Sequence, residues 1–428
     1  MNDAFDIVEG DLFIEGDRIA AVGHVPEGTR ASTIIDASGS LVLPGFVQTH
    51  IHLCQTLFRG LADDLPLLAW LRQRIWPLEA AHDEATLAAT ARLAAAELQL
   101  GGTTSVLTME TVHGTAAVFE ALVPTGLRAT VGKCLMDVRG DAPARLYQDA
   151  RAGLDEAVAL HRQWHGAANG RLRTALAPRF AISCSRELLE ATASLSRELG
   201  LLVHTHASEQ REEIDVVRAS TGMDNLEYLT AVGLASPKLC AAHCVHVSDS
   251  EQALLAEHAV KVLHCPSSNL KLGSGIAPVT QMRARGISVS LGADGAACNN
   301  TLDMFQEMRL AATLQAMRSG PGAVSARDAA WMATREGALA LGLEGEIGVI
   351  APGARADVIV VAADGPHHTP AADPYSTLVY GCRASDVRVT VIDGEIRARD
   401  GQLTWAAWPE LRSAANEAAR NVRGRAGV

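Results

Sequence analysis

The sequence predicts an α/β fold, a (β/α)₈ barrel with a small β-sandwich domain that is built from both chain ends. Three observations predict it: eight short apolar runs through the middle of the chain, amphipathic segments between most of them, and short alternating strands at both ends. Buried strands that alternate with helices are typical of a parallel barrel. The eight runs are residues 41–52, 103–109, 128–135, 173–180, 201–206, 239–245, 260–265 and 287–294.

The segments between the runs have the pattern of surface helices. Residues 83–101 and 185–200 are rich in Ala, Leu, Glu and Arg, and each segment ends on a glycine. A glycine directly after the last periodic residue favours the end of a helix. We therefore expect a helix after most of the eight strands.

The two chain ends have the pattern of short β-strands. Asp11 to Ile14 and Ile19 to Val22 flank a turn, and residues 345–361 and 386–404 alternate apolar and polar positions around Gly and Asp. This alternation is typical of half-buried strands joined by hairpins. We expect residues 1–43 and 345–428 to form the β-sandwich domain and residues 44–344 to form the barrel.

Composition excludes several classes of function. The chain has 428 residues with 37 Lys+Arg against 49 Asp+Glu, a net charge of −12. This acidic balance argues against binding to nucleic acid or to an anionic membrane surface. No apolar run is long enough to span a membrane, and the acidic start does not resemble a signal peptide, so we expect a cytoplasmic protein.

Histidines gather where the predicted strands end. His50 and His52 end the first run, His204 and His206 the fifth and His243 the sixth. His264 and Asp294 end the seventh and eighth runs. The carboxyl ends of barrel strands carry the active site in this fold, so we expect these side chains to share one site.

The spacing of these residues indicates a metal centre. Side chains two residues apart on a strand point to the same side, so His50 and His52 converge. With His206 and Asp294 they form a set of three nitrogens and one oxygen, which suits zinc or, alternatively, ferrous iron and leaves a position open for water. The fourth run offers no lysine that could bridge two ions, which favours one divalent metal.

Three further roles follow from this placement. Glu209 comes three residues after His206 and can carry a proton from the nucleophile to a ring nitrogen or a leaving group. His243 can hydrogen-bond the nucleophile or the substrate. Asp294 can orient the nucleophile and accept its proton.

Five motifs in order resemble the amidohydrolase superfamily, in particular its deaminase and chlorohydrolase branch. They are PGFVQTHIH (44–52), HTHASE (204–209), AAHCVH (241–246), HCPSSNLKL (264–272) and LGADGAACNNTLDMFQEMRLA (291–311). The resemblance implies metal ligands at His50, His52, His206 and Asp294, a proton shuttle at Glu209, a polarising role for His243 and a supporting role for His204. It also implies a homo-oligomer, either a dimer or a tetramer.

Residues 62–80 are similar to the deaminases of 5′-methylthioadenosine, S-adenosylhomocysteine and 5′-deoxyadenosine. The resemblance implies that Glu79 holds the ribose hydroxyls, which is chemically reasonable because its two oxygens can each accept one hydrogen bond. The alternative is an exposed glutamate at a helix start. Trp76 packs either on the substrate or on the barrel.

Other positions are similar to guanine deaminase instead. Pro178-Arg179-Phe180 stands where the S-adenosylhomocysteine deaminases tend to have a Pro-His pair. Gln55 follows His52 by three residues. Arg179 offers donors to purine acceptors, Phe180 offers a face for stacking, and Gln55 can donate and accept.

We therefore predict a metal-dependent hydrolytic deaminase of an aminopurine, first of all a 5′-modified adenosine, with a small-molecule substrate. The alternative substrates are guanine or an s-triazine that loses amine or chloride. A metal-free scaffold protein is the competing class, and it would be expected to lack some of the ligands. The sequence leaves two alternatives for each of four further residues. Glu110 and His113 either line the pocket or are loop residues without a substrate role. Arg128 and Arg139 either bind an anionic substrate group or form ion pairs at the surface.

Overall fold

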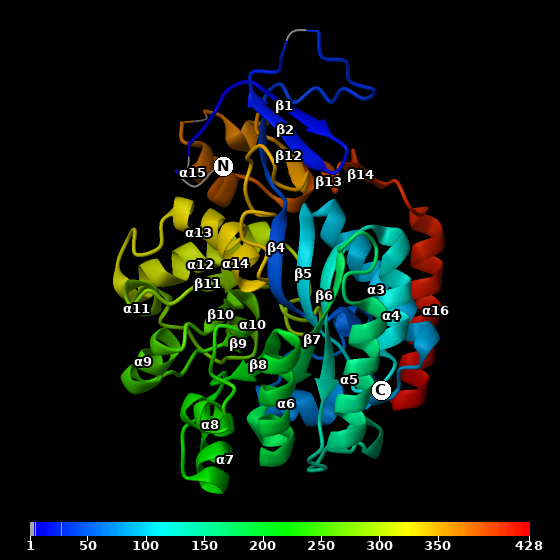
Figure 1. The fold of residues 1–428 in the computed structure, drawn as a ribbon, viewed down its shortest axis with the longest axis vertical. Coiled ribbons are helices and arrows are strands. Elements are labelled where there is room, and N and C mark those ends of the chain that lie inside the picture. Colours follow the sequence, from blue (N-terminus) through cyan, green and yellow to red (C-terminus); the bar gives the residue numbers. More distant parts are fainter. Residues whose placement is uncertain (1–3, 5, 27, 371) are drawn as a thin grey trace.

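The computed structural model describes residues 4, 6–26, 28–370 and 372–428. Its main sheet holds eight parallel strands in sequential order, as Figure 1 shows. The predicted barrel is confirmed, because each predicted run overlaps one of these strands. They are β4 (Phe46–Ile51), β5 (Thr103–Met109), β6 (Arg128–Leu135), β7 (Leu172–Pro178), β8 (Val203–Ala207), β9 (Leu239–His243), β10 (Lys261–His264) and β11 (Val289–Leu291).

The barrel closes where β11 meets β4. The backbone N–H of Asp294 donates to the carbonyl oxygen of His50 at 3.0 Å. The Thr49 hydroxyl donates to the carbonyl oxygen of Leu291, also at 3.0 Å. These bonds bring the ends of the first and last barrel strands together.

Helices surround the barrel strands (Figure 1). The two predicted glycines stand at the helix ends: Gly101 follows α3 with a φ of −91°, and Gly200 ends α6 with a φ of +68°. At the start of α3, the Asp83 side chain accepts from the Thr86 N–H. The helices are α1 (Leu67–Trp70), α2 (Trp76–Ala80), α3 (Glu84–Leu100), α4 (Thr115–Leu122), α5 (Ala150–Trp164), α6 (Arg186–Leu199), α7 (Arg211–Thr221), α8 (Asn225–Ala231), α9 (Asp249–Glu257), α10 (Pro266–Lys271), α11 (Val279–Ala284), α12 (Met304–Ser319), α13 (Ala326–Met332), α14 (Arg335–Ala340), α15 (Pro374–Ser376) and α16 (Trp408–Ala426).

The two chain ends build separate antiparallel sheets beside the barrel, at the top of Figure 1. β1 (Asp11–Glu15) and β2 (Arg18–Gly23) form the predicted hairpin. The second sheet has the order β15-β14-β13-β12-β3 and consists of β3 (Ser40–Pro44), β12 (Val358–Ala362), β13 (Val387–Ile392), β14 (Glu395–Arg399) and β15 (Gln402–Leu403). The domain boundaries at 43/44 and 344/345 stay predictions, and residues 1–3, 5 and 27 of the first segment lie outside the described part of the chain.

The first predicted run is divided between the two sheets at Gly45. Leu41 to Pro44 pair with β12, whereas Phe46 begins the barrel strand β4. A Cβ at Gly45 would lie 2.1 Å from the Thr104 side chain, so a larger residue does not fit at this crossing point.

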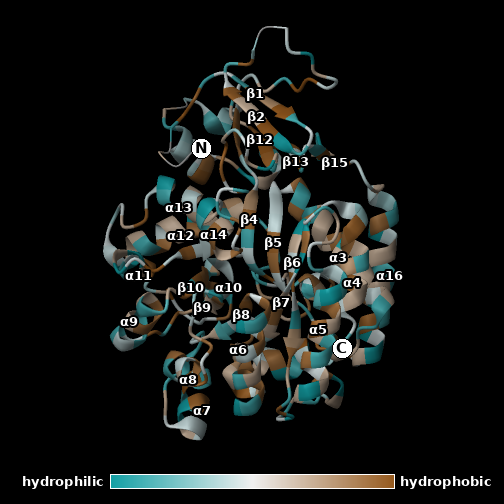
Figure 2. Ribbon diagram, in the orientation of Figure 1, coloured by the Kyte–Doolittle hydropathy of each residue, from teal (hydrophilic) through white to brown (hydrophobic). Residues whose placement is uncertain are grey.

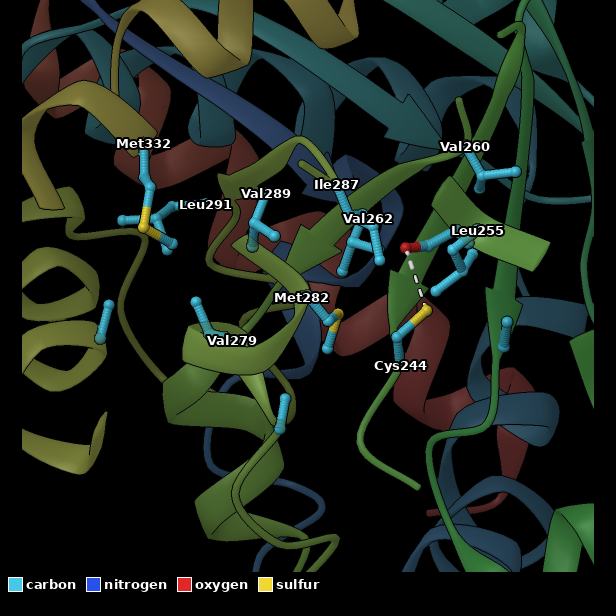
Figure 3. Packing of buried hydrophobic residues seen from close by; sticks show 14 of the residues in the cluster. Cys244, Leu255, Val260, Val262, Val279, Met282, Ile287, Val289, Leu291 and Met332 are labelled. Carbon is cyan, nitrogen blue, oxygen red and sulfur yellow. Dashed lines mark hydrogen bonds between the residues drawn. The ribbon is translucent and has the colours of Figure 1, made fainter. Parts of the chain in front are cut away.

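Apolar side chains fill the space between the barrel strands and the helices. Figure 3 shows Val262 of β10 and Val289 and Leu291 of β11 packed against Met282 of α11 and Met332 of α13. Figure 2 shows that hydrophilic residues lie on outer helices such as α7 and α9. None of the described helices combines the length and the apolar composition needed to cross a bilayer.

Arg128 corrects an expectation, because it lies neither at the surface nor at a substrate site. It is buried at the amino end of β6, where its Nε donates to Asp357 Oδ2 at 2.8 Å and a terminal N–H group donates to Asp393. Both carboxylates come from segments beside the second sheet. Arg128 therefore joins the barrel to the sheet of the chain ends.

Candidate active site

The carboxyl ends of β4, β8, β9 and β11 bring buried histidines and one aspartate together. His50 lies one residue before the end of β4, His52 follows the strand in extended backbone, and β8 contributes His206. The Nε2 atoms of His52 and His206 lie 3.3 Å apart. The predicted convergence of strand ends therefore places these three imidazoles at one point.

Hydrogen bonds fix the tautomers of two of these imidazoles. Nδ1–H of His52 donates to the Met109 carbonyl oxygen at 2.8 Å, and Nδ1–H of His206 donates to the Arg179 carbonyl oxygen at 2.7 Å. A carbonyl can only accept, so Nδ1 carries the hydrogen in both rings. The Nε2 lone pairs are left free to bind a cation.

His50 has the same tautomer through a second histidine. His204 lies two residues before His206 and donates from Nδ1 to the Thr108 carbonyl oxygen at 3.2 Å, so that its Nε2 accepts from His50 Nδ1 at 2.6 Å. His50 Nε2 is buried without a hydrogen-bond partner. Burial lowers the pKa of His50 to about 4, which keeps this ring neutral.

Asp294 completes the group. Its Oδ1 lies 3.2 Å from His50 Nε2 and 3.3 Å from His52 Nε2, while Ser268 donates to Oδ2 at 2.7 Å. Four ligands about 2.1 Å from a tetrahedral zinc ion lie about 3.4 Å from one another. The spacing and the free lone pairs therefore fit one divalent metal.

Glu209 and His243 lie beside this group. Glu209 Oε2 is 3.6 Å from His243 Nε2, and Ser274 donates to Glu209 Oε1 at 3.3 Å. Burial raises the pKa of Glu209 to about 7. Burial also lowers the pKa of His243, but the Glu209 and Asp294 carboxylates outweigh this effect and raise it overall. Asn269 orients His243 by accepting from its Nδ1 at 2.9 Å.

A small pocket adjoins these residues. It leaves a free volume of about 10 Å³, which is room for about one water molecule. A purine is much larger, so its entry requires part of the wall to move. The lining residues are His52, Gln55, Leu67, Trp70, Leu71, Arg179, Phe180, His206, Glu209, His243, Leu272 and Asp294.

Glu79 lies behind the pocket wall and is not one of the lining residues. Arg179 donates to both of its oxygens, at 3.1 Å for Oε1, and Gln55 Nε2 donates to Oε1 at 2.9 Å. Burial would raise the pKa of Glu79, but the Arg179 guanidinium holds it below its usual value. The two sequence signals for the substrate, Glu79 and Arg179, thus form a single ion pair.

The other predicted substrate residues are divided between pocket and core. Phe180 lines the pocket and stacks on His206 with ring centroids 4.4 Å apart. Trp76 does not line the pocket and lies in an apolar cluster with residues of α16. Trp70, which the sequence reasoning missed, lines the pocket, and its indole N–H is buried without a hydrogen-bond partner. Trp70 precedes Trp76 by six residues in the same family-like segment.

The residues left open take positions outside the pocket lining. Glu110 is buried and accepts from the Cys54 N–H at 3.1 Å, which ties the end of β5 to the turn after His52. His113 is exposed. The exposed Arg139 lies over the Tyr147 ring at 4.7 Å.

The chain is similar to known proteins over most of its length. The model of the amidohydrolase family matches residues 41–397. The 5′-deoxyadenosine deaminase of Methanothermobacter thermautotrophicus is 44% identical over 404 residues, which cover 94% of this chain and 92% of that protein. A zinc-bound adenosine deaminase from Xanthomonas campestris superposes with a TM-score of 0.85 at 33% identity, covering 90% of this chain and 87% of that one. Guanine deaminase of E. coli superposes with a TM-score of 0.82 at 29% identity, covering 91% and 92%.

Proposed function

The chain belongs to the amidohydrolase family, and on this basis we propose that it is a metal-dependent hydrolytic deaminase of an aminopurine. The first substrates to consider are 5′-deoxyadenosine, 5′-methylthioadenosine and S-adenosylhomocysteine, which would give the inosine analogue and ammonia. One observation carries the proposal: three imidazole lone pairs and Asp294 meet next to a buried carboxyl and His243.

His50, His52, His206 and Asp294 would hold one divalent ion, with zinc as the first choice and ferrous iron as the alternative. Such an ion, when bound, polarises the substrate and lowers the pKa of a water molecule to about 7. The Nδ1 bonds of the three histidines would keep their Nε2 atoms directed at it.

The surrounding residues supply the proton transfers. Hydrolysis adds water at the carbon that bears the amino group and breaks the C–N bond. Asp294 accepts the proton that the attacking water loses and returns it to the amino group, which leaves as ammonia. Glu209 delivers a proton to the ring nitrogen and recovers one from the added hydroxyl group as the carbonyl forms. The pKa of Glu209, near 7, suits a group that both gives and takes a proton at neutral pH. His243 donates a hydrogen bond to the oxygen added to the ring.

A free heterocycle is the second candidate substrate, and the environment of Glu79 favours it. Arg179 and Gln55 already bond both carboxylate oxygens, which leaves too few free positions for two ribose hydroxyls. Besides Trp70 Nε1 and His243 Nε2, the buried atoms of the lining residues that lack a partner form a donor–acceptor pair, Arg179 Nε and Gln55 Oε1. This pair suits the edge of guanine or of an s-triazine.

Ammonia release decides between the two candidates. The metal-loaded protein is assayed on 5′-deoxyadenosine, 5′-methylthioadenosine, S-adenosylhomocysteine, adenosine, adenine, guanine and melamine. If Glu79 holds the ribose, the protein releases ammonia from the nucleosides, and Glu79→Gln lowers this activity more on the nucleosides than on the free bases. If the free ring is the substrate, the protein releases ammonia from guanine or melamine, and Arg179→Met and Gln55→Leu lower this activity more than Glu79→Gln does. Release of ammonia from none of these compounds by metal-loaded protein would contradict the proposal.

Two further parts of the account rest on the sequence. The homo-oligomer, as a dimer or tetramer, is implied by the family resemblance, and we propose a cytoplasmic location. Both stay predictions. Size-exclusion chromatography with light scattering tests the first.

A further inference from the structure

The peptide group between Ser208 and Glu209 is held from both sides. Its carbonyl oxygen accepts from the backbone N–H groups of Val245 at 3.0 Å and His246 at 2.9 Å. Its N–H, which belongs to Glu209, donates to Glu213 Oε2 at 2.9 Å. Three hydrogen bonds therefore fix the plane of this one peptide.

This peptide needs support because the backbone before it is strained. Ser208 has a φ of +52°, in the left-handed region that residues other than glycine rarely adopt. Such a conformation is unfavourable and persists only when the surroundings impose it. Rotation of the peptide would relieve the strain and would turn the Cα of Glu209, and with it the carboxyl group, away from its place.

Glu213 is well placed to prevent this rotation. It lies in the first turn of α7 and is fully buried at 0% exposure. Its other oxygen, Oε1, accepts from Asn225 Nδ2 at the start of α8. The carboxylate is thus fixed by a second helix and does not depend on substrate or metal for its position.

The same peptide links Glu209 to His243. Val245 and His246, which bind the Ser208 carbonyl, follow His243 at the end of β9. The side chains of Glu209 and His243 face each other at 3.6 Å. The bond from Glu213 therefore acts at the point where the two strand ends are held in register.

We propose that Glu213 is a positioning residue that fixes the Ser208–Glu209 peptide and so places the Glu209 carboxyl for proton transfer. The inference rests on the proposed function, in which Glu209 moves the proton. An ordinary helix cap would stabilise α7 alone. The bonded N–H here belongs to the proton-transfer residue itself, so loss of Glu213 should act on turnover.

Substitutions at Glu213 test this role by steady-state kinetics. Glu213→Ala should lower kcat about 10²-fold, because displacement by about 1 Å can cost this much, with KM and bound metal unchanged. Glu213→Gln should keep kcat within a few-fold of wild type. Its amide oxygen can accept from Glu209, and its amide N–H can donate to Asn225 Oδ1 once the Asn225 amide turns by 180°, because Oδ1 has no partner to lose. Glu212→Ala, at the exposed neighbouring position, is the matched control and should not change kcat.

A double variant and crystal structures distinguish a role in positioning Glu209 from a general loss of structure. In a Glu209→Gln background, Glu213→Ala should cause no further loss of kcat, whereas a merely structural role would lower it again. The crystal structure of Glu213→Ala should show a displaced Glu209 carboxyl and that of Glu213→Gln an unchanged one.

Wild-type kcat in Glu213→Ala, or an unmoved Glu209 in its structure, would overturn the inference. A metal-loaded wild type that releases no ammonia would overturn the proposed function instead, and the two crystal structures would still decide whether Glu213 places Glu209.

Discussion

The two ends of the barrel bury charged groups in different ways. At the amino end, Arg128 donates to the carboxylates of Asp357 and Asp393, and Arg171 adds a further contact to Asp393 at 3.3 Å. At the carboxyl end, His50 Nε2 and His243 Nε2 are buried without hydrogen-bond partners.

This difference indicates which end binds ligands. Buried polar groups cost free energy unless they are paired. The amino end meets this cost within the protein, so its charges serve to join the barrel to the sheet of the chain ends. At the carboxyl end, buried polar atoms beside the pocket have no partner within the protein, and a metal and a substrate can supply the missing partners.

The largest effect is expected at the metal ligands. Asp294→Ala should remove the bound metal and reduce ammonia release to the background level, because the ion loses its only carboxylate ligand among the four proposed. Elemental analysis and an ammonia assay measure the two effects. A variant that kept both its metal and its turnover would show that Asp294 is not a ligand of the catalytic metal.

Glu209→Gln should leave metal binding intact and lower kcat by about 10²–10⁴-fold, the usual range for a general acid–base group. The amide keeps the shape of the side chain but cannot exchange a proton. The comparison is made at equal metal content. Near-normal turnover would remove Glu209 from the mechanism.

His204→Ala should weaken metal binding by about 10–100-fold, since His204 fixes the tautomer of His50 from behind. Competition with a chelator of known affinity measures this change. His24→Ala, at an exposed position, serves as the control. Equal metal affinity in both variants would mean that the lone pair of His50 does not depend on His204.

Arg128→Met should have the smallest effect on activity and a large one on stability. Removal of one partner leaves the Asp357 and Asp393 carboxylates buried without their cation, at a cost of about 3–5 kcal/mol in unfolding free energy. Chemical denaturation measures it, with Arg151→Ala at an exposed ion pair as a control expected to cost less than about 1 kcal/mol. A fall in kcat at full folding and full metal content would contradict the separation of the two ends.

Local pattern was enough to predict the barrel and the location of the candidate metal ligands. Strands are short apolar runs, and the two-residue period places His50 with His52 and His204 with His206. Because the fold brings strand ends together, residues far apart in sequence could be assigned to one site.

Features that depend on contacts between distant elements could not be predicted in this way. Nothing around Arg128 marks its partners more than 200 residues later, and an isolated arginine is more often at the surface. The pairing of Glu79 with Arg179 joins two segments that each carry a different family signal. Trp70 and Trp76 lie in one segment of similar composition, and only the path of the chain through a short π-helical turn, Leu71–Ile75, decides which one reaches the pocket.

The most direct test of the central claim is the metal content of the purified protein measured together with ammonia release from the nucleosides and bases named above. The account predicts one divalent ion per chain, loss of ammonia release on chelation, and recovery when zinc is returned. Ammonia release that continued at full rate in metal-free protein would contradict it.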